Sequence, residues 1–282
     1  MKTCLMYFMV LILMTTLSVQ ADANTTNDHF KKVVWIVFEN TNFAKALAQP
    51  DFNKLTKNGV LFTNLTAEAH PSQGNYIAMI AGSKLGVTND NVIDLKETHI
   101  GDLLEKANLR WKVYAEDFPG KCFVGKNSGQ YARKHVPFMS FLNVTQNSSR
   151  CMNVEDATGF SSDLKKGTLP EFSMYIPNLK DDGHDTGVDF AGKWLTTTFG
   201  SILSAPEKLG DTLFVITFDE SGPLSTNNQI YTVLLGSRIK AGIQNSQAIQ
   251  HPALLKMIED EFGIGNLGRD DSKAPVIDGI WK

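Results

Sequence analysis

The sequence of 282 residues is poor in cysteine, with three, and has no marked excess of charge of either sign. Its 27 lysines and arginines face 30 aspartates and glutamates, which gives a net charge of −3. So few cysteines exclude a small disulfide-dense scaffold, and the lack of like-charge blocks argues against a disordered acidic or basic tail. A nucleic-acid-binding protein usually has a clear basic excess, because phosphate neutralisation supplies much of its affinity. We therefore expect no nucleic-acid partner.

Long apolar runs are also scarce, and the longest one stands at the N-terminus, from Leu5 to Leu17. Lys2 precedes this run and small residues follow it up to Ala23, as in a secretory signal peptide. The run is shorter than the ~20 residues that a membrane span needs. We expect residues 1–23 to be cleaved, with an uncleaved anchor as the alternative. The mature chain is then secreted, outside the cell or into a lysosome-like compartment, without a stable membrane anchor.

Several continuous runs of apolar and β-branched residues predict strands that are buried on both faces. Helical stretches fall between them, and this alternation indicates an α/β fold with a mostly parallel central sheet and helices on both faces. The expected strands are Val33–Phe38, Val60–Leu65, Lys112–Tyr114, Phe172–Ile176, Thr212–Phe218 and Ile230–Leu235. The expected helices are Asn75–Ala81, Ile100–Ala107, Gly192–Ser204 and Pro252–Phe262. No repeat or linker divides the chain, so residues 24–282 are expected to form a single domain.

The segment 120–168 lacks clear periodicity and is interpreted as an excursion over the sheet. It contains Cys122 and Cys151, the two cysteines that remain after signal cleavage. In an oxidising compartment such a pair predicts a disulfide, with two reduced core cysteines as the alternative. Four Asn-X-Ser/Thr sequons suggest surface glycosylation in a secreted chain. They lie at Asn24, Asn64, Asn143 and Asn147.

Several common catalytic motifs are missing. The chain has no G-x-x-x-x-G-K-[ST], H-E-x-x-H or G-x-S-x-G pattern, which removes the usual support for kinase-like, zincin and lipase functions. The stretch Gly263–Gly268 matches G-x-G-x-x-G but follows an expected helix rather than a strand. We interpret it as a helix C-terminal turn, not as a dinucleotide site.

Polar residues follow three of the expected strands directly. Glu39-Asn40 and Asp219-Glu220 end two of them, and a third runs into Asp181–Asp185, which includes His184. Carboxyl ends of parallel strands are where ligands bind in open sheets. Each cluster could also serve as helix caps or loop solubilisers. Together, their oxygen and imidazole ligands suit a divalent cation bound to a phosphate ester.

Ser72 is the candidate nucleophile, because it opens a helix at a point where the macrodipole and free N–H groups favour an anion. A serine placed there could attack a phosphoryl group. The alternative is an ordinary N-cap serine.

Seven short motifs, in this order and spacing, resemble the phosphoesterase family that holds secreted acid phosphatases and phospholipases C, within the alkaline-phosphatase-like superfamily. The chain most resembles the short fungal-type acid phosphatases from about Val33 to Gly268. The motifs are Phe38–Asn40, His70–Gln73 with Asn75-Tyr76, Tyr114–Pro119, Tyr131–Phe138, Asp182–Asp185, Phe218–Glu220 and Ile258–Asp260.

The resemblance implies an alkaline-phosphatase-like fold and roles for the residues at matching positions. It implies that the catalytic residues are Ser72, His135, Asp182 and His184. It implies that a divalent cation, whose identity the sequence leaves open, is held by Glu39, Asn40, Asp219 and Glu220. Residues expected to contact substrate are His70, Asn75, Asp185 and His251.

The expected function is therefore that of a secreted acid phosphatase, which hydrolyses small phosphate monoesters through a phosphoserine intermediate. A phospholipase C-type phosphodiesterase is the first alternative. A non-catalytic phosphate-ester-binding protein is the second, because Gly74 and Val136 depart from the family pattern of proline and asparagine.

Overall fold

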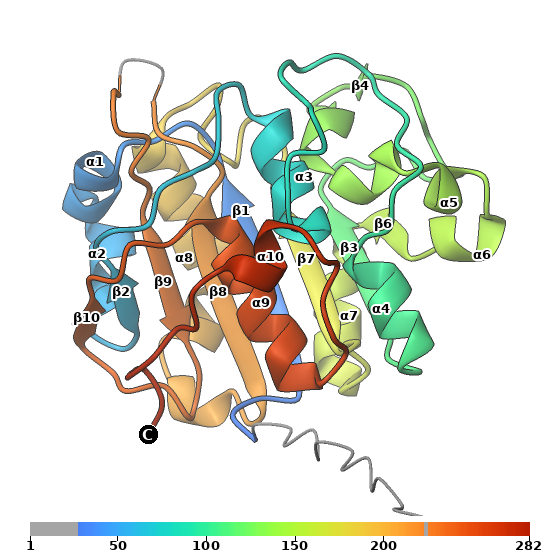
Figure 1. Cartoon of the computed structure of the whole chain (residues 1–282). Coiled ribbons are helices and arrows are strands. Elements are labelled where there is room, and N and C mark those ends of the chain that lie inside the picture. The colour runs from blue at the N-terminus through green and yellow to red at the C-terminus, as the bar shows by residue number, and fades with distance from the viewer. Residues whose placement is uncertain (1–27, 223–224) are drawn as a thin grey trace, which may run out of the picture.

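The structure is a computed structural model that describes residues 28–222 and 225–282 (Figure 1). The signal peptide expected at residues 1–23 and the sequon at Asn24 lie outside the described residues. Among the described helices, none combines the length and the apolar character that crossing a membrane requires.

One eight-stranded sheet forms the centre of the molecule (Figure 1). Its strands lie in the order β10 (Ile243–Asn245), β2 (Val60–Phe62), β9 (Thr232–Leu235), β8 (Thr212–Phe218), β1 (Lys32–Phe38), β7 (Phe172–Ile176), β3 (Trp111–Ala115) and β6 (Val154–Asp156). Strand β9 is antiparallel to both of its neighbours, and the other pairs are parallel. The expected mostly parallel sheet is confirmed.

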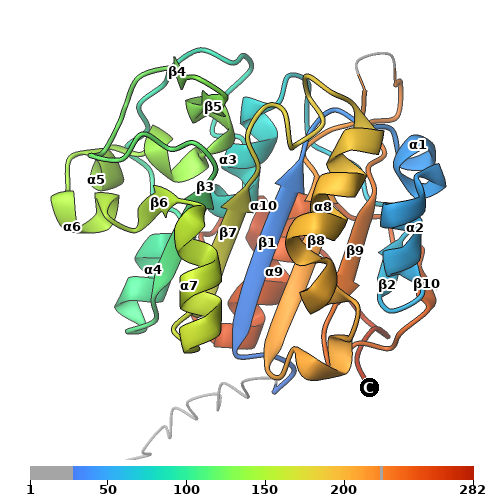
Figure 2. The same ribbon diagram turned by 180° about the vertical axis from the view of Figure 1, so that it is seen from behind.

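Helices cover both faces of this sheet. Figure 1 shows one face covered by α3 (Gln73–Ala81), α4 (Ile100–Lys106), α9 (His251–Phe262) and α10 (Asp270–Lys273). Figure 2 shows the other face covered by α7 (Thr158–Lys166) and α8 (Val188–Leu203), with α2 (Pro50–Thr56) packed beside α8. Shorter elements complete the fold: α1 (Phe43–Ala48), α5 (Leu142–Thr145), α6 (Ser148–Cys151), the hairpin of β4 (Asn127–Ser128) and β5 (Tyr131–Ala132), and 3₁₀ turns at Arg133–His135, Pro137–Ser140 and Pro206–Lys208.

The central position of β1 explains its unbroken hydrophobicity. It lies between β7 and β8, and residues 33–38 have no exposed surface. Burial at roughly 25 cal/mol per Å² makes such a strand a main source of stability. Its last residue, Phe38, pairs in register with Phe218 of β8 and contacts Phe52 of α2 at 5.1 Å between ring centroids. The two strands therefore end level with one another.

Interpreting 120–168 as an excursion over the sheet is wrong for its last part. Strand β6 extends the sheet beside β3, and α7 packs against β3. Only three residues of β6 pair, which is too short a run to show a period in the sequence. The expected disulfide is present, since Cys122 and Cys151 are bonded with their Cα atoms 5.5 Å apart. Gly263 ends α9 in the left-handed conformation, which confirms that Gly263–Gly268 begins as a helix C-terminal turn.

The sequons within the described residues differ in their surroundings. Asn64 and Asn147 are exposed. Asn143 is half-buried, and its Nδ2 donates to both carboxylate oxygens of Asp102 at 3.0 and 3.2 Å. Glycosylation of Asn143 would therefore compete with a hydrogen-bonded contact of the fold.

Glu259 of α9 yields a prediction about stability. Glu259 is 1% exposed, and its carboxyl group faces that of Asp271. Burial, together with the charges of Asp271 and Asp260, raises the pKa of Glu259 to about 9. Below pH 4.5 the group is protonated in both the folded and unfolded states. Between pH 4.5 and 9 the unfolded state releases a proton that the folded state retains, so stability falls as pH rises.

We expect Glu259→Gln to remove this fall, because the amide resembles the protonated acid. Melting temperatures of the two proteins should coincide near pH 4 and separate towards pH 9, with the variant higher by about 2–4 °C per kcal/mol relieved. Calorimetry across this range is the measurement. A difference in melting temperature between the two proteins that stays the same at every pH would contradict the prediction.

Candidate functional site

The three polar clusters expected from the sequence meet at the carboxyl ends of β1, β7 and β8. Backbone hydrogen bonds join them directly, since the Glu39 N–H donates to the Asp182 carbonyl at 3.1 Å. The Asp219 N–H donates to the Phe38 carbonyl at 2.8 Å. The side chains of Glu39, Asp182, Asp219 and Glu220 are all buried. We call these four side chains the carboxylate cluster.

Asn40 turns the chain sharply after β1. Its φ of 51° lies in the left-handed region, which asparagine tolerates better than most residues. This turn lets the Asn40 N–H donate to Asp219 Oδ1 at 3.1 Å, and the Glu220 N–H donates to the same oxygen at 2.6 Å. The Asn40 side chain donates to Glu39 Oε2 at 2.6 Å. The four expected cation ligands therefore lie together.

Glu220 contacts the candidate nucleophile. The Ser72 Oγ donates to Glu220 Oε1 at 3.2 Å, while His70 Nδ1 lies 2.8 Å from Glu220 Oε2. Ser72 is the first residue before α3 but makes no side-chain capping hydrogen bond. The structure thus excludes the ordinary N-cap interpretation of Ser72, because its hydroxyl faces a carboxylate instead of the helix.

Helix α3 is buried on every side, which fixes the Ser72 turn. A Cβ on Gly74 would lie 3.1 Å from the Val87 carbonyl oxygen, so the backbone around residue 87 approaches the helix closely at this glycine. The Gln73 N–H at the start of this helix is not free, since it donates to Asp90 Oδ1 at 3.0 Å.

Asn75 and His251 support the site from within. Asn75 is fully buried, and its Oδ1 accepts from the Glu68 and Ala69 N–H groups at 3.0 and 2.9 Å. His251 is also fully buried, with Nδ1 2.7 Å from Glu68 Oε2 and Nε2 3.1 Å from the Phe218 carbonyl. All of these hydrogen bonds, of Asn75 and of His251, are made with other groups of the protein. Asn75 Nδ2 also lies 3.4 Å from Glu220 Oε2. These contacts hold the loop before Ser72 and the end of β8, and the substrate contact expected for Asn75 and His251 stays a prediction.

His135 is enclosed by the cluster. It is 1% exposed, its Nε2 contacts Glu39 Oε1, and its Nδ1 lies 3.5 Å from Asp182 Oδ2. The Tyr76 ring stacks on its face at 5.0 Å between centroids. Burial opposes a charge on His135, but Glu39 and Asp182 outweigh it and raise the pKa to about 10. Burial alone would raise the pKa of Glu39, yet the His135 charge lowers it to about 2. Each group of the pair thus favours the charged form of the other.

The remaining carboxylates are poorly compensated. Burial, and then the charges of Glu39 and Glu220, raise the pKa of Asp219 well above its usual value. Burial and the Glu39 charge raise the pKa of Glu220 to about 7, against the hydrogen bond from Ser72. Burial also raises the pKa of Asp182. Burial of the carboxylates, and after it their mutual repulsion, thus dominates the electrostatics of the site.

His184 and His70 lie at the exposed side of the site. Their side chains are 36% and 39% exposed, against 2% for His135. His184 Nδ1 lies 2.7 Å from Asp185 Oδ1, and its Nε2 lies 4.0 Å from Glu39 Oε2. The expected orientation of His184 by Asp185 agrees with this geometry.

Sequence reasoning missed Lys134, Asp90 and Tyr76. Lys134 Nζ lies 3.9 Å from Glu39 Oε1 and 2.9 Å from Asp90 Oδ2. Lys134 precedes His135 and Tyr76 follows Asn75, so their position next to predicted site residues could have indicated them. Nothing in the sequence around Asp90 distinguishes it from a polar loop.

The residues present fit a cation by their chemistry. Asp219 Oδ2 is buried and has no hydrogen-bond partner in the described part of the chain, and a positive charge there would relieve the crowding. As the side chains stand, no group of three or more His, Cys, Asp or Glu in residues 28–222 and 225–282 could hold a metal ion. The hydrogen bonds above explain this, because Glu39 faces His135 and Asn40 while Glu220 faces Ser72 and His70.

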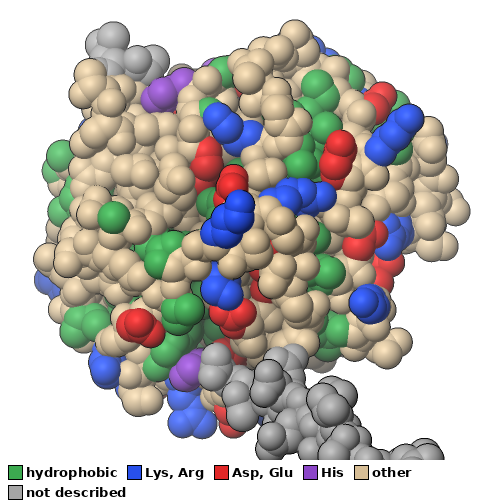
Figure 3. Space-filling model, viewed as in Figure 1, with side chains coloured by type: hydrophobic (Ala, Val, Ile, Leu, Met, Phe, Trp, Pro, Cys, Tyr) green, Lys and Arg blue, Asp and Glu red, His purple; other side chains and the backbone are tan. Residues whose placement is uncertain are grey.

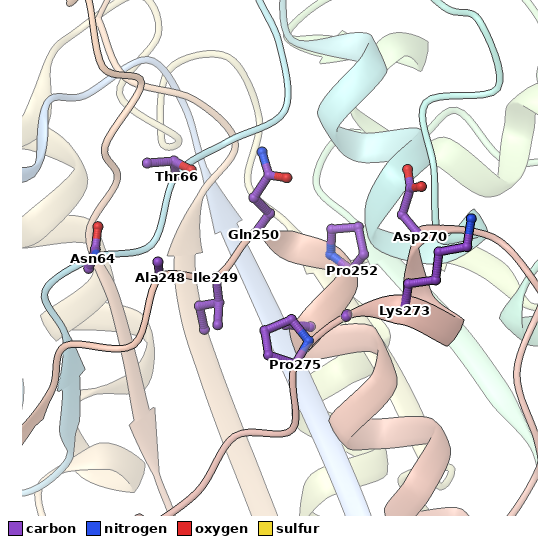
Figure 4. Close-up of a pocket in the computed structure, with 11 residues that line it drawn as sticks. Asn64, Thr66, Ala248, Ile249, Gln250, Pro252, Asp270, Lys273 and Pro275 are labelled. Carbon is purple, nitrogen blue, oxygen red and sulfur yellow. The ribbon is translucent and has the colours of Figure 1, made fainter.

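A cavity of about 400 Å³ lies elsewhere, on the face covered by α9 and α10 (Figure 4). Asn64, Gln250, Pro252, Asp270 and Lys273 are among its lining residues, and no member of the carboxylate cluster lines it. Figure 3 shows acidic and basic side chains interspersed on this face. The carboxylate cluster, not this cavity, carries the features of a reactive site.

The chain matches the model of the phosphoesterase family over residues 41–265. It is 33% identical over 268 residues to an acid phosphatase of Aspergillus fumigatus, covering 91% of this chain and 60% of that protein. It is 32% identical to a phosphatidylinositol-3-phosphatase of Mycobacterium tuberculosis, covering 89% of this chain and 83% of that protein. The chain thus spans about 60% of the length of the fungal relatives.

Solved structures support the fold. A protein in the alkaline phosphatase superfamily from Vibrio parahaemolyticus superposes with a TM-score of 0.59 at 15% identity, covering 90% of this chain and 72% of that one. A phosphonate monoester hydrolase of Agrobacterium radiobacter gives 0.55 at 12% identity, covering 83% of this chain and 74% of that one. The expected alkaline-phosphatase-like fold is confirmed.

The different burial of the two histidines yields a prediction. We expect His135→Gln to lower the free energy of unfolding by about 3–5 kcal/mol, because Glu39 would be left as a buried charge without its partner. His184→Gln should change it by less than about 0.5 kcal/mol, since the ring is partly exposed. Urea unfolding at pH 7 is the measurement. Equal losses of unfolding free energy in the two variants would contradict the inference that His135, and not His184, compensates the buried charge of Glu39.

Proposed function

Because the chain belongs to the phosphoesterase family, we propose that it is an acid phosphatase that hydrolyses phosphate monoesters through a phosphoserine on Ser72. One observation carries the proposal. The Ser72 hydroxyl caps no helix and instead donates to Glu220 at the point where the carboxylate cluster meets α3. A hydroxyl held against a carboxylate is the arrangement that an activated nucleophile needs.

In the first step, the Ser72 Oγ attacks phosphorus in line with the leaving alcohol. The Oγ–P bond forms as the P–O bond to the alcohol breaks, and Glu220 accepts the hydroxyl proton through its 3.2 Å hydrogen bond. His184 gives a proton to the departing alkoxide, and Asp185 orients its ring. Water then attacks the phosphoserine and gives a proton to His184, which restores its charge. The Oγ–P bond breaks, Glu220 returns its proton to the Ser72 Oγ, and inorganic phosphate leaves.

A divalent cation would be held by Glu39, Asn40, Asp219 and Glu220. When bound, it would neutralise phosphate charge and lower the pKa of the Ser72 hydroxyl. The carboxylate crowding, and the unpartnered Asp219 Oδ2, support this part of the proposal.

His135 takes a different role from His184 in this proposal. Its two ring nitrogens face Glu39 and Asp182, so it contributes a fixed positive charge and not a proton to the leaving group. His70, which is partly exposed beside Glu220, is the second histidine able to reach substrate.

A second candidate substrate class is a phosphoinositide headgroup. The relative from Mycobacterium tuberculosis, of which the chain covers 83%, is named as a phosphatidylinositol-3-phosphatase. Hydrolysis there is also cleavage of a monoester, so the same Ser72 chemistry applies. A phosphodiesterase of the phospholipase C type would need to accept a substrate with one negative charge fewer.

We also propose that the chain is secreted. The apolar run before Ala23 and the Cys122–Cys151 disulfide support an oxidising compartment. Exposed Asn64 and Asn147 are the sequons best placed to carry glycans.

The nucleophile is tested with Ser72→Ala. We expect phosphate release from p-nitrophenyl phosphate between pH 4 and 9 to fall by roughly three orders of magnitude or more, with an unchanged melting curve. A radiolabelled phosphoserine should be trapped in the wild type by acid quenching and be missing in the variant. Retained activity, or label on another residue, would sink the proposal.

The cation is tested by chelation. We expect EDTA to reduce turnover and a divalent cation to restore it, while the same cation raises the wild-type melting temperature. Asp219→Asn should need a higher cation concentration for both effects. Full activity after exhaustive chelation, with no thermal shift on adding any divalent cation, would remove the metal from the proposal.

A further inference from the structure

The ammonium group of Lys134 lies at the edge of the carboxylate cluster, 3.9 Å from Glu39 Oε1. Of the ion pairs that Glu39, Asp182 and Glu220 make within the described residues, the pair with Lys134 is the one that uses a lysine or arginine; the others use histidine. A dianionic phosphate requires positive charge at such a crowded site. Lys134 is therefore the candidate to supply this positive charge.

The chain around Lys134 fixes where its side chain can go. Lys134 is half-buried, whereas every other residue from 131 to 141 is buried. On one side, the Arg133 guanidinium donates to the Met139, Val124 and Ile93 carbonyls. On the other side, His135 is held by Glu39 and Asp182. Lys134 is thus anchored by both of its neighbours.

Asp90 links Lys134 to the nucleophile. Its Oδ2 accepts from Lys134 Nζ at 2.9 Å, and its Oδ1 accepts from the Gln73 N–H at 3.0 Å, one residue after Ser72. Glu39 Oε1 lies 3.9 Å from the same Nζ. Burial opposes the ammonium charge, but Glu39 and Asp90 outweigh it and raise the Lys134 pKa. Nζ is held between the nucleophile turn and the end of β1, with its side chain 19% exposed.

We propose that Lys134 binds a non-bridging oxygen of the substrate phosphate and favours monoesters over diesters, with Asp90 as its positioning residue. The inference rests on the proposed phosphatase function. A monoester near neutral pH carries close to two negative charges, whereas a diester carries one. A fixed ammonium group next to Glu39, linked through Asp90 to the residue after Ser72, stabilises the more highly charged substrate more strongly.

The test compares Lys134→Gln, Lys134→Arg and Asp90→Asn with wild type. Lys180→Gln is the control, because Lys180 is exposed on the segment after β7 and its ammonium group lies over the Phe190 ring. We expect Lys134→Gln to raise KM for p-nitrophenyl phosphate, and the Kd of inorganic phosphate in calorimetry, by about tenfold or more. Lys134→Arg should restore part of the loss. Asp90→Asn should weaken phosphate binding less than Lys134→Gln.

Selectivity is measured as the ratio of kcat/KM for p-nitrophenyl phosphate to that for bis-p-nitrophenyl phosphate. We expect this ratio to fall several-fold in Lys134→Gln and to stay unchanged in Lys180→Gln. Equal losses on both substrates, or unchanged phosphate Kd in a folded Lys134→Gln protein, would overturn the inference while leaving the phosphatase function in place. If the wild type binds phosphate without turnover, the proposed function fails and the Kd comparison still decides the role of Lys134.

Discussion

The burial of four carboxylates at one edge of the sheet is the constraint on which the rest of the site depends. Taking a charge out of water costs several kcal/mol unless a partner compensates it. Glu39 has its compensation in His135, which it contacts directly, and each favours the charged form of the other. Within the described residues, one oxygen of Asp219 accepts from two backbone N–H groups and the other has no hydrogen-bond partner. The desolvation free energy of the cluster is therefore only partly compensated by its partners, a feature that is common at functional sites.

The sheet imposes this crowding because of its strand order. Strand β1 lies between β7 and β8, and all three run in parallel and end within about one residue of each other. The residues that follow these strands lie close together, since the three neighbouring strands end at the same edge of the sheet. Helix α3, buried on every side, then brings Ser72 to the cluster from a different part of the chain. Packing of the core thus fixes the distances on which the chemistry depends.

Much of this could be predicted from the sequence, and the rest could not for physical reasons. Runs such as Thr212–Phe218 are long and unbroken, so their strands were found at the right bounds. Strand β10 has two half-buried residues and one exposed residue, so it gives no such signal. The sequence also does not reveal the hydrogen-bond partner of Ser72, because Ser72 and Glu220 are 148 positions apart. Likewise, the internal role of His251 depends on Glu68, a distant residue that no local pattern connects to it.

Three histidines at one site divide the work by their exposure. A fully buried imidazolium is held in place by its counter-ions, so it can stabilise charge but cannot exchange protons easily with a substrate. A partly exposed ring such as His184 has Nδ1 against Asp185, and its Nε2 lies 4.0 Å from Glu39 Oε2. The sequence motifs alone do not distinguish His184 from His135. The depth at which each ring lies does distinguish them, and in the proposed mechanism only the accessible ring acts on the leaving group.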